Sequence, residues 1–277
     1  MSLGAHTRIM GILNITPDSF SDGGRYFQQD RALAHAEEMI AQGADILDVG
    51  GESSRPFSDP VTEEQEACRV LPVIEYLARR VPVPISIDTT KSGIARRAID
   101  AGASIINDIS SLISDPEIGI IAANHDVLLI LMHMKGTPKT MQVAPAYDDL
   151  IDEIHDFLAD AISRAAACGV GLSRMIIDPG IGFGKTVSHN LRLIRELSRF
   201  NTLKAPILIG SSRKAFIRKI LTSETGSEPS PDHPDVMHGS QAAVAAAVLS
   251  GAHIVRVHDV AAVRATVRIV DAVKNAR

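Results

Sequence analysis

Short apolar segments rich in β-branched residues alternate along the chain with longer segments of helical periodicity. This alternation predicts a parallel β-sheet whose strands are joined by helical crossovers. Each apolar segment is followed by enough chain for a helix. We expect eight strands, at residues 8–13, 45–49, 84–87, 104–106, 127–132, 174–177, 206–209 and 252–257.

The intervening segments predict helices, several of which begin with a capping residue. Several also end at a glycine just before the next strand, as Gly43 does, where glycine can adopt the left-handed conformation of a helix C-cap. The expected helices cover residues 30–42, 62–80, 92–101, 148–168, 188–200, 239–250 and 261–275, with shorter ones in the remaining gaps.

Eight strand–helix units favour a single closed (β/α)8 TIM barrel, with the active site at the C-terminal mouth of the strands. A doubly wound sheet needs a reversal of strand order and usually has fewer strands. Periodicity alone does not prove closure. Residues 222–237, rich in Ser, Pro and acidic residues, predict a surface loop, because a boundary there would leave only about 40 residues for a second core. We therefore expect residues 1–277 to form one domain.

The composition is that of an ordinary globular chain, with 45% hydrophobic and 22% charged residues. The net charge of −5 and the lack of a Lys/Arg run argue against nucleic acid as a partner. Residues 1–7 lack the apolar segment of a signal peptide, and no apolar stretch is long enough to span a membrane. We expect a cytoplasmic protein without membrane contact.

The two cysteines, Cys68 and Cys168, lie far apart within predicted helices. They lack the paired spacing of a zinc site or a redox motif. We expect both to be buried free thiols.

Polar residues stand where the predicted strands end. Any one of them is explained by the capping that strand ends ordinarily need. Together, at the mouth of one barrel, they indicate a planar ligand with several hydrogen-bonding groups. They are Asn14, Asp48 with Glu52, Asp88, Asn107 with Asp108, His133, Asp178, Ser211 through Lys214, and His258.

The loop after the sixth predicted strand, residues 178–186, contains three alternate glycines and a lysine. It is not a Walker A loop, because Pro179 stands where that motif needs its first glycine, and the spacing of a dinucleotide fingerprint is also missing. The glycines instead allow the backbone to approach a flat ligand beside Phe183.

An anion site is predicted at the ends of the last two strands. Residues 210–214 place backbone N–H groups, a helix N-terminus and two cations together. Strand alternation sends Arg256 and His258 to the same side. An ion pair with Asp259 is an alternative explanation for this pair.

Two long loops follow the first two strands. Residues 14–24 mix Phe20 with polar residues and glycine, which is typical of a lid. Residues 50–57 carry Arg55 near the mouth, where it can close on a diphosphate.

These segments resemble the motifs of the dihydropteroate synthase family. The resemblance spans about residues 8–275, with eight motifs in family order at the predicted strand ends. They are residues 11–24, 48–56, 87–89, 106–109, 131–134, 178–185, 212–214 and 256–259.

The resemblance implies that 6-hydroxymethyl-7,8-dihydropterin diphosphate condenses with p-aminobenzoate to give 7,8-dihydropteroate and pyrophosphate. The exocyclic CH2–O bond of the pterin breaks, and the arylamine nitrogen bonds to that carbon. Family members are similarly thought to pass through a cationic pterin after diphosphate departs. Such enzymes are sulfonamide targets and usually form homodimers, here through the apolar residues 241–249 and 261–273, although core packing explains this composition equally well.

The resemblance also implies roles for individual residues. The pterin would be held by Asp88, Asn107, Asp178 and Lys214, and Mg²⁺ by Asn14. The benzoate ring would lie between Phe183, Pro56 and the first loop, with its carboxylate at the helix after Ser212. The diphosphate would be surrounded by Ser54, Arg55, Arg256 and His258, and Val257 is a further expected substrate-binding residue. The residues expected to act in catalysis are Asn14, Arg55, Asp88, Lys214, Arg256 and His258.

This sequence departs from the family at two positions. Many members carry threonine where this chain has Ser54, and serine where it has Ala215, whose hydroxyl would contact the benzoate carboxylate. Phe57 adds a ring beside the expected benzoate slot. Sensitivity to sulfonamides therefore does not follow from the sequence.

Two other functions share parts of this pattern. A methyltransferase that uses a methylated tetrahydrofolate has a similar pterin pocket but needs no diphosphate-binding residues, which are present here at Ser54, Arg55 and residues 212–214 and 256–258. A non-catalytic pterin-binding protein is disfavoured by the intact Asn14, first loop and Arg55.

Overall fold

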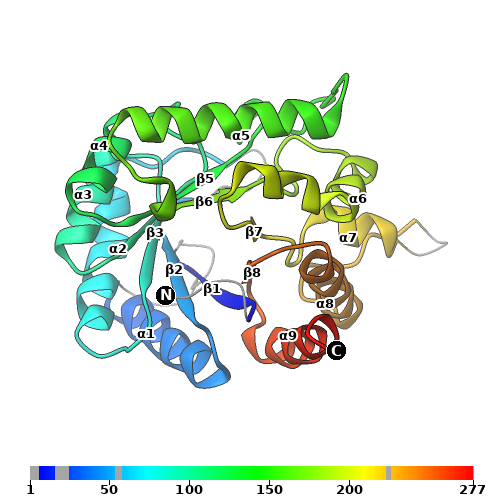
Figure 1. Ribbon diagram of the computed structural model, residues 1–277. Helices are drawn as coiled ribbons and strands as arrows, with labels where there is room; N and C mark the ends of the chain where they lie inside the picture. The colour runs from blue at the N-terminus through cyan, green and yellow to red at the C-terminus, as the bar shows by residue number, and fades with distance from the viewer. Residues whose placement is uncertain (1–5, 16–24, 54–57, 223–225, 277) are drawn as a thin grey trace.

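The computed structural model describes residues 6–15, 25–53, 58–222 and 226–276, except for the side chains of residues 25–28. Its strands stand at the centre, and helices surround them (Figure 1). The strands are β1 (Arg8–Asn14), β2 (Ile46–Gly50), β3 (Ile85–Asp88), β4 (Ile105–Asp108), β5 (Leu128–Met132), β6 (Met175–Asp178), β7 (Leu208–Ile209) and β8 (Ile254–Val257).

The eight strands form one parallel sheet, with the order β6-β5-β4-β3-β2-β1-β8-β7. The two outer strands of this order also meet, because Ile177 of β6 forms a parallel bridge with Ile207 next to β7. The ring is therefore closed. The expected (β/α)8 barrel is confirmed, and its strands follow one another around the ring as the sequence pattern predicts.

The helices that alternate with the strands also lie near the predicted positions. Within the described part of the chain, the 3-10 helices η2 (Leu172–Arg174) and η3 (Leu197–Leu203) accompany them. The helices are α1 (Arg25–Gln42), α2 (Glu63–Ala78), α3 (Ser92–Asp100), α4 (Glu117–Asn124), α5 (Leu150–Ala167), α6 (Val187–Arg195), α7 (Ala215–Ile220), α8 (Pro234–Leu249) and α9 (Val260–Lys274).

Local capping explains where several helices begin. Thr62 and Gln65 form a capping box at the start of α2, and Thr186 forms another with His189 at α6. Asp149 caps α5 by accepting hydrogen bonds from two backbone N–H groups. These contacts satisfy donors that the first turn of a helix leaves without partners.

The core has two layers because the side chains of each strand point alternately to the helices and into the barrel. The larger layer lies between strands and helices and includes Leu47, Ile74 and Ile87. The inner layer fills the barrel with one side chain from each of seven strands. These side chains are Met10, Ile46, Ile105, Ile130, Ile176, Leu208 and Ile254.

The prediction for residues 222–237 was wrong at one end. Residues 234–237 form the first turn of α8, which was expected to begin only at residue 239. Pro234 occupies the first turn, where its missing N–H costs nothing, and His233 caps the helix. Interpreting the segment only as a loop overlooked this favourable position for proline.

Two further helix boundaries differ from the prediction. Helix α1 begins at Arg25, five residues before the predicted start. The helix expected over residues 188–200 ends as an α-helix at Arg195 and continues as η3. The apolar pattern is shared by both helix types, so it did not reveal this change.

The prediction that both thiols are buried was also wrong. Both cysteines are free, but Cys68 is exposed and Cys168 is half-buried. Cys68 follows Ala67 on α2 and falls outside the buried stripe of that helix. Cys168 is the C-cap of α5, at the edge of the core.

Among the described residues, no helix combines the length and the apolar character needed to cross a membrane.

Candidate active site

Strand alternation explains why polar side chains lie at the mouth, directly above the inner core layer. Side chains two positions further along a strand point into the barrel again, nearer its C-terminal mouth. On four strands this position is polar, so the apolar interior ends in a polar layer. The pairs are Ile46 with Asp48, Ile105 with Asn107, Ile176 with Asp178, and Ile254 with Arg256.

Arg256 joins two carboxylates across this layer. Its Nε lies 2.6 Å from Asp48 Oδ2, and its Nη2 lies 2.7 Å from Asp88 Oδ2. The alternative pairing of Arg256 with Asp259 is therefore wrong. The guanidinium group stays inside the mouth, with one side chain of β8 contacting side chains of both β2 and β3.

The enclosed position of these groups changes their acidity. Burial, partly offset by Arg256, raises the pKa of Asp88 to about 7. Burial alone would lower the pKa of Arg256, but Asp48 and Asp88 outweigh it and raise the pKa. Arg256 is thus a permanent cation, whereas Asp88 changes its charge near neutral pH.

Asp48 was noted at the end of its strand but was not among the expected site residues. It is fully buried and accepts a hydrogen bond from Asn107 Nδ2 at 3.1 Å, besides its contact with Arg256. The available signal was the two-residue alternation from Ile46, which places Asp48 inside the barrel.

Lys214, which follows β7, lies against the glycine-rich loop after β6. Its Nζ donates to the carbonyl oxygen of Ile181 and stands 4.2 Å from the centre of the Phe183 ring. Burial, partly offset by Asp178, lowers the pKa of Lys214 to about 7. Burial also raises the pKa of Asp178. The site therefore contains a second group whose charge changes near neutral pH.

Glycine is required where this loop approaches its neighbours. Gly180 has φ +72°, and a Cβ atom there would lie 1.8 Å from the carbonyl oxygen of His133. Gly182 has φ +83°, and its Cβ would lie 2.7 Å from Cδ of Lys214. Both positions need the left-handed conformation and the missing side chain. The glycines thus allow close approach to His133 and Lys214, whereas the predicted approach to a flat ligand stays a prediction.

Lys185 has an internal role that the sequence did not indicate. It is buried, and its Nζ lies 2.8 Å from His133 Nδ1 and 2.9 Å from the carbonyl oxygen of Phe183. Burial lowers the pKa of His133, so its ring is neutral and Nδ1 accepts the hydrogen bond. The lysine side chain therefore fixes the loop that carries Phe183.

The two cations after β7 point in different directions. Lys214 faces the mouth, but Arg213 pairs with Asp259 at 2.6 Å and 3.0 Å and also contacts Asp232. Arg213 has φ 58°, a left-handed conformation that is uncommon for residues other than glycine. The expectation that both cations meet at one anion was therefore wrong.

The remaining expected residues are partly described. His258 Nδ1 lies 3.1 Å from Ser212 Oγ, which links the ends of β7 and β8. The Val257 side chain is fully buried in the outer core, so only its backbone can contact a ligand. Other predictions fall outside the described residues, namely those for Phe20, Ser54, Arg55, Pro56 and Phe57.

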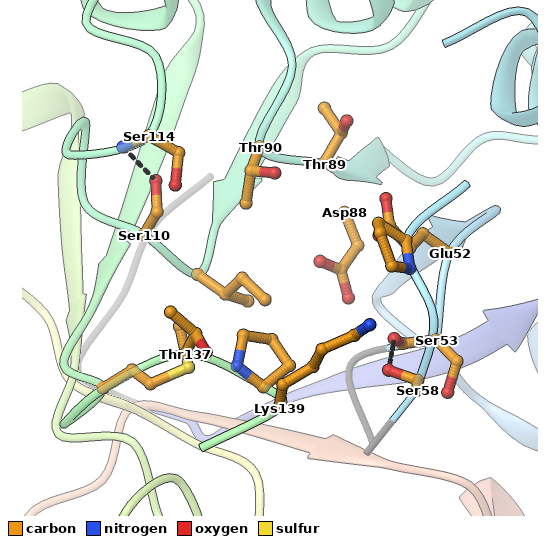
Figure 2. A pocket seen from close by; sticks show the side chains of 14 residues that line it. Glu52, Ser53, Ser58, Asp88, Thr89, Thr90, Ser110, Ser114, Thr137 and Lys139 are labelled. Carbon is orange, nitrogen blue, oxygen red and sulfur yellow. Dashed lines mark hydrogen bonds between the residues drawn. The ribbon is translucent and has the colours of Figure 1, made fainter. Parts of the chain in front are cut away.

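A cavity of about 270 Å³ opens beside Asp88, among the loops after β2 to β5 (Figure 2). Its wall combines apolar side chains, including Ile109 and Met134, with several hydroxyl groups and Lys139. In Figure 2, the Asp88 carboxylate points into the space between Lys139 and Thr90. The expected pterin-binding aspartate is therefore accessible from a partly apolar cavity, as a ligand site requires.

Asn14, the residue expected to hold Mg²⁺, lies near Asp88. A Cβ atom at Gly50 would lie 3.5 Å from Asn14 Oδ1 and 3.6 Å from Asp88 Cβ, so this glycine leaves space between the two side chains. Among the described residues, no group of three or more His, Cys, Asp or Glu side chains is arranged to hold a metal ion. Mg²⁺ commonly binds one or two protein oxygens, together with substrate phosphates and water. This arrangement fits Asn14 better than a complete protein cage.

Comparison with known proteins identifies the family. A model of pterin-binding enzymes matches residues 10–258. The dihydropteroate synthase of Escherichia coli K12 is 44% identical over 99% of this chain and 94% of that protein. The enzyme of Bacillus subtilis is 42% identical over 97% of this chain and 89% of that protein. The chain belongs to the dihydropteroate synthase family.

Solved structures of dihydropteroate synthases share the whole barrel. The enzyme of Yersinia pestis, in a complex with a sulfonamide drug, is 41% identical with a TM-score of 0.91, and the match covers 100% of this chain and 98% of that one. The enzyme of Xanthomonas albilineans with 4-aminobenzoic acid is 42% identical with a TM-score of 0.89, covering 98% and 94%. The family resemblance in the motifs thus extends to the complete fold.

Proposed function

We propose that this chain is a dihydropteroate synthase, which condenses 6-hydroxymethyl-7,8-dihydropterin diphosphate with p-aminobenzoate and releases pyrophosphate. The observation that carries this proposal is the polar layer inside the mouth, where Asp88, Asn107, Asp178, Lys214 and Arg256 meet. A structure of the Xanthomonas albilineans family member in complex with 7,8-dihydropteroate supports it.

The polar layer suits the edge of a pterin. The ring presents neighbouring N–H, amino and carbonyl groups, which pair with carboxylates, an amide and an ammonium group. Asp88 and Asp178 accept, Lys214 donates, and the carbonyl oxygen of Asn107 accepts because its Nδ2 already contacts Asp48. Gly182 leaves room for the aliphatic part of Lys214, which brings the ammonium group of this residue into the mouth.

The diphosphate would lie on the side of Arg256 and His258, at the ends of β8 and its loop. Arg256 is a cation at every physiological pH and remains anchored at Asp48. Ser54 and Arg55 of the second loop would complete this subsite, and the backbone of Val257 would contribute. Mg²⁺ at Asn14 would neutralise part of the charge of the leaving diphosphate.

The chemistry needs little proton transfer, because an arylamine is neutral and nucleophilic at neutral pH. The contribution of the protein is to hold the two reactants in line, to stabilise the leaving diphosphate and to exclude water. Arg256 and His258 provide the stabilisation. Asp88 and Asp178 stabilise positive charge that develops on the pterin as the C–O bond breaks.

The benzoate ring would stack on the half-buried ring of Phe183, next to Lys214. Its carboxylate would lie at residues 212–215, where α7 begins with Ala215 in place of the serine of many relatives. Backbone N–H groups at this helix N-terminus would then bind the carboxylate.

We propose in addition that the protein is a cytoplasmic homodimer. Large apolar side chains remain exposed on α8 and α9, namely Leu249, Ile269 and Val273, which are 57%, 68% and 62% accessible. A second copy covering them would remove apolar surface from water. Light scattering after size-exclusion chromatography tests this: a dimer mass is expected, and a monomer at micromolar concentration contradicts it.

The activity is tested by incubating the purified protein with dihydropterin diphosphate, Mg²⁺ and labelled p-aminobenzoate. Labelled dihydropteroate and pyrophosphate are measured together, with Lys214→Ala as the control. Equal amounts of both products, lost in the variant, are the expected result. Pterin binding without release of pyrophosphate would instead support the methyltransferase or the non-catalytic binding protein.

A further inference from the structure

Asp48 contacts two residues that the proposed function assigns to different parts of the substrate. One oxygen, Oδ2, lies 3.1 Å from Asn107 Nδ2 and 2.6 Å from Arg256 Nε. Asn107 is expected to bind the pterin, and Arg256 the diphosphate. The carboxylate itself is fully buried, so it reaches the substrate only through these two side chains.

The contact with Asn107 fixes the direction of an amide. An ionised carboxylate only accepts hydrogen bonds, so the NH2 group of Asn107 must face Asp48. The carbonyl oxygen of the amide then has a defined direction and can accept from an N–H group of the pterin. Without Asp48, the amide could turn and present a donor at the same place.

The contact with Arg256 anchors a side chain that has a second partner. Arg256 also holds Asp88 through Nη2 at 2.7 Å. A pterin that binds to Asp88 competes with this contact, whereas Asp48 is shielded from the ligand. Asp48 can therefore keep the guanidinium in place while Asp88 exchanges Arg256 for the pterin.

Stability alone is a poor explanation for this arrangement. A buried ion pair commonly contributes no more than well-packed apolar side chains of similar size would. The second oxygen of Asp48, Oδ1, has no hydrogen-bond partner among the described residues, which adds a cost. The inner positions of the preceding layer, such as Ile46, show that this wall accepts apolar side chains.

We propose that Asp48 is a positioning residue that couples the pterin and diphosphate subsites through Asn107 and Arg256. The inference rests on the proposed function, because that function assigns the two subsites. Removal of the charge at Asp48 weakens the binding of both halves of the substrate. The binding of p-aminobenzoate, which contacts neither residue, is unaffected.

The test compares Asp48→Asn with Asp271→Asn. Asp271 is also a buried aspartate, but it lies on α9, where it accepts hydrogen bonds from the backbone N–H and the hydroxyl of Thr7 just before β1, away from the C-terminal mouth. Thermal unfolding checks that both variants fold, and Asp48→Ser replaces Asp48→Asn if that variant does not.

For each protein, the KM of both substrates is measured, together with the affinities for 6-hydroxymethyl-7,8-dihydropterin and for pyrophosphate with Mg²⁺ by calorimetry. We expect Asp48→Asn to raise the KM of dihydropterin diphosphate, and to weaken both ligands, by about tenfold or more, the loss typical of a charge-assisted hydrogen bond. The KM of p-aminobenzoate should change by less than about threefold. Asp271→Asn should change each of the two KM values and the two affinities by less than about threefold.

Variants with two substitutions show whether Asp48 acts through its partners. In an Asn107→Ala background, Asp48→Asn should weaken the binding of the hydroxymethyl pterin little further, and in an Arg256→Gln background the same holds for pyrophosphate. The proposal would be overturned if Asp48→Asn weakened each ligand by the same factor in these backgrounds as in the wild type, or if Asp48→Asn and Asp271→Asn had equal effects.

Failure of the proposed function gives a different result. If the wild-type protein binds both ligands but forms no dihydropteroate, the synthase activity is contradicted, and the affinities alone decide the role of Asp48. If the wild-type protein binds neither ligand, both proposals are overturned.

Discussion

Among the described site residues, Asp88 and Lys214 have pKa values near 7. When the pH rises through this value, Asp88 gains a negative charge and Lys214 loses its positive charge. In the proposed function, Asp88 binds the pterin as a carboxylate, the form it has above this pH. Lys214 binds it as an ammonium group, the form it has below this pH. The form of the site that binds the pterin therefore has its largest population near pH 7.

We predict that kcat/KM for dihydropterin diphosphate is bell-shaped, with its maximum near pH 7. It falls by up to about tenfold per pH unit on each side, because Asp88 gains a proton on the acid side and Lys214 loses one on the alkaline side. Rates from pH 5 to 9 check this. The affinity for the hydroxymethyl pterin provides the control, since it excludes ionisation of the diphosphate; a flat profile between pH 6 and 8 contradicts the assignment.

Phe183 provides a prediction about the second substrate. Phe183→Ala removes the ring on which the benzoate would stack, and we expect the KM of p-aminobenzoate to rise by about tenfold or more, from the loss of aromatic contact area. The KM of dihydropterin diphosphate should change much less. A wild-type KM for p-aminobenzoate in steady-state assays would exclude this position for the ring.

At the scale of single residues, strand alternation predicted which polar side chains point into the mouth of the barrel. Asn107, Asp178 and Arg256 each follow an inner apolar residue by two positions, so their direction was predictable. The ion-pair partners of the charged side chains could not be predicted in this way. The pairing of Arg256 with Asp48 joins residues 208 positions apart, and Arg213, which has a left-handed backbone, pairs with Asp259. Such contacts depend on distances across the barrel, which one sequence does not contain.

Among the elements, the loop after β6 depends most on its glycines. We predict that Gly180→Ala lowers the free energy of unfolding by about 3 kcal/mol or more, because it adds a clash with the His133 carbonyl oxygen to the strain of a positive φ. Denaturant unfolding measures this change, and pterin affinity should fall with it.

Gly226→Ala is the matched control. Gly226 has φ +79°, similar to the φ of Gly180, but no atom lies within 4 Å of its added Cβ, among the contacts described. Only the conformational cost of about 1–2 kcal/mol then remains. Equal losses in the two variants would mean that the close approach to His133 has no energetic importance.

Element boundaries were predicted less well than element types. The apolar period identified each strand and most helices, but it does not separate an α-helix from the 3-10 turn of η3. It also missed the start of α8, where the deciding feature is Pro234 in the first turn. Both features are determined by single residues at the ends of elements.

At the scale of the whole molecule, the segment before the first strand is hydrogen-bonded to the last helix. Asp271 of α9 accepts hydrogen bonds from Thr7 N at 2.9 Å and from Thr7 Oγ1 at 2.7 Å, just before β1. We predict that Asp271→Ala lowers the free energy of unfolding by about 1–3 kcal/mol, because it leaves buried donors without a partner. Denaturant unfolding and steady-state kinetics together check that kcat stays unchanged.

Glu75→Ala is the control, since it removes an exposed ion pair with Arg79, worth at most about 1 kcal/mol. A loss of activity at unchanged stability in Asp271→Ala would contradict a purely structural role for this contact.

The eight-fold alternation predicted the barrel, but its closure between β6 and β7 rests on a single bridge that the sequence did not reveal.

The most direct test of the account follows the oxygen atom that links the pterin to its diphosphate. Dihydropterin diphosphate with ¹⁸O at this bridge is converted with p-aminobenzoate, and both products are analysed by mass spectrometry. Breakage of the C–O bond at the mouth of the barrel predicts unlabelled 7,8-dihydropteroate and an equal amount of pyrophosphate that carries the label. Label retained on the pterin, or pyrophosphate formed without dihydropteroate, would contradict it.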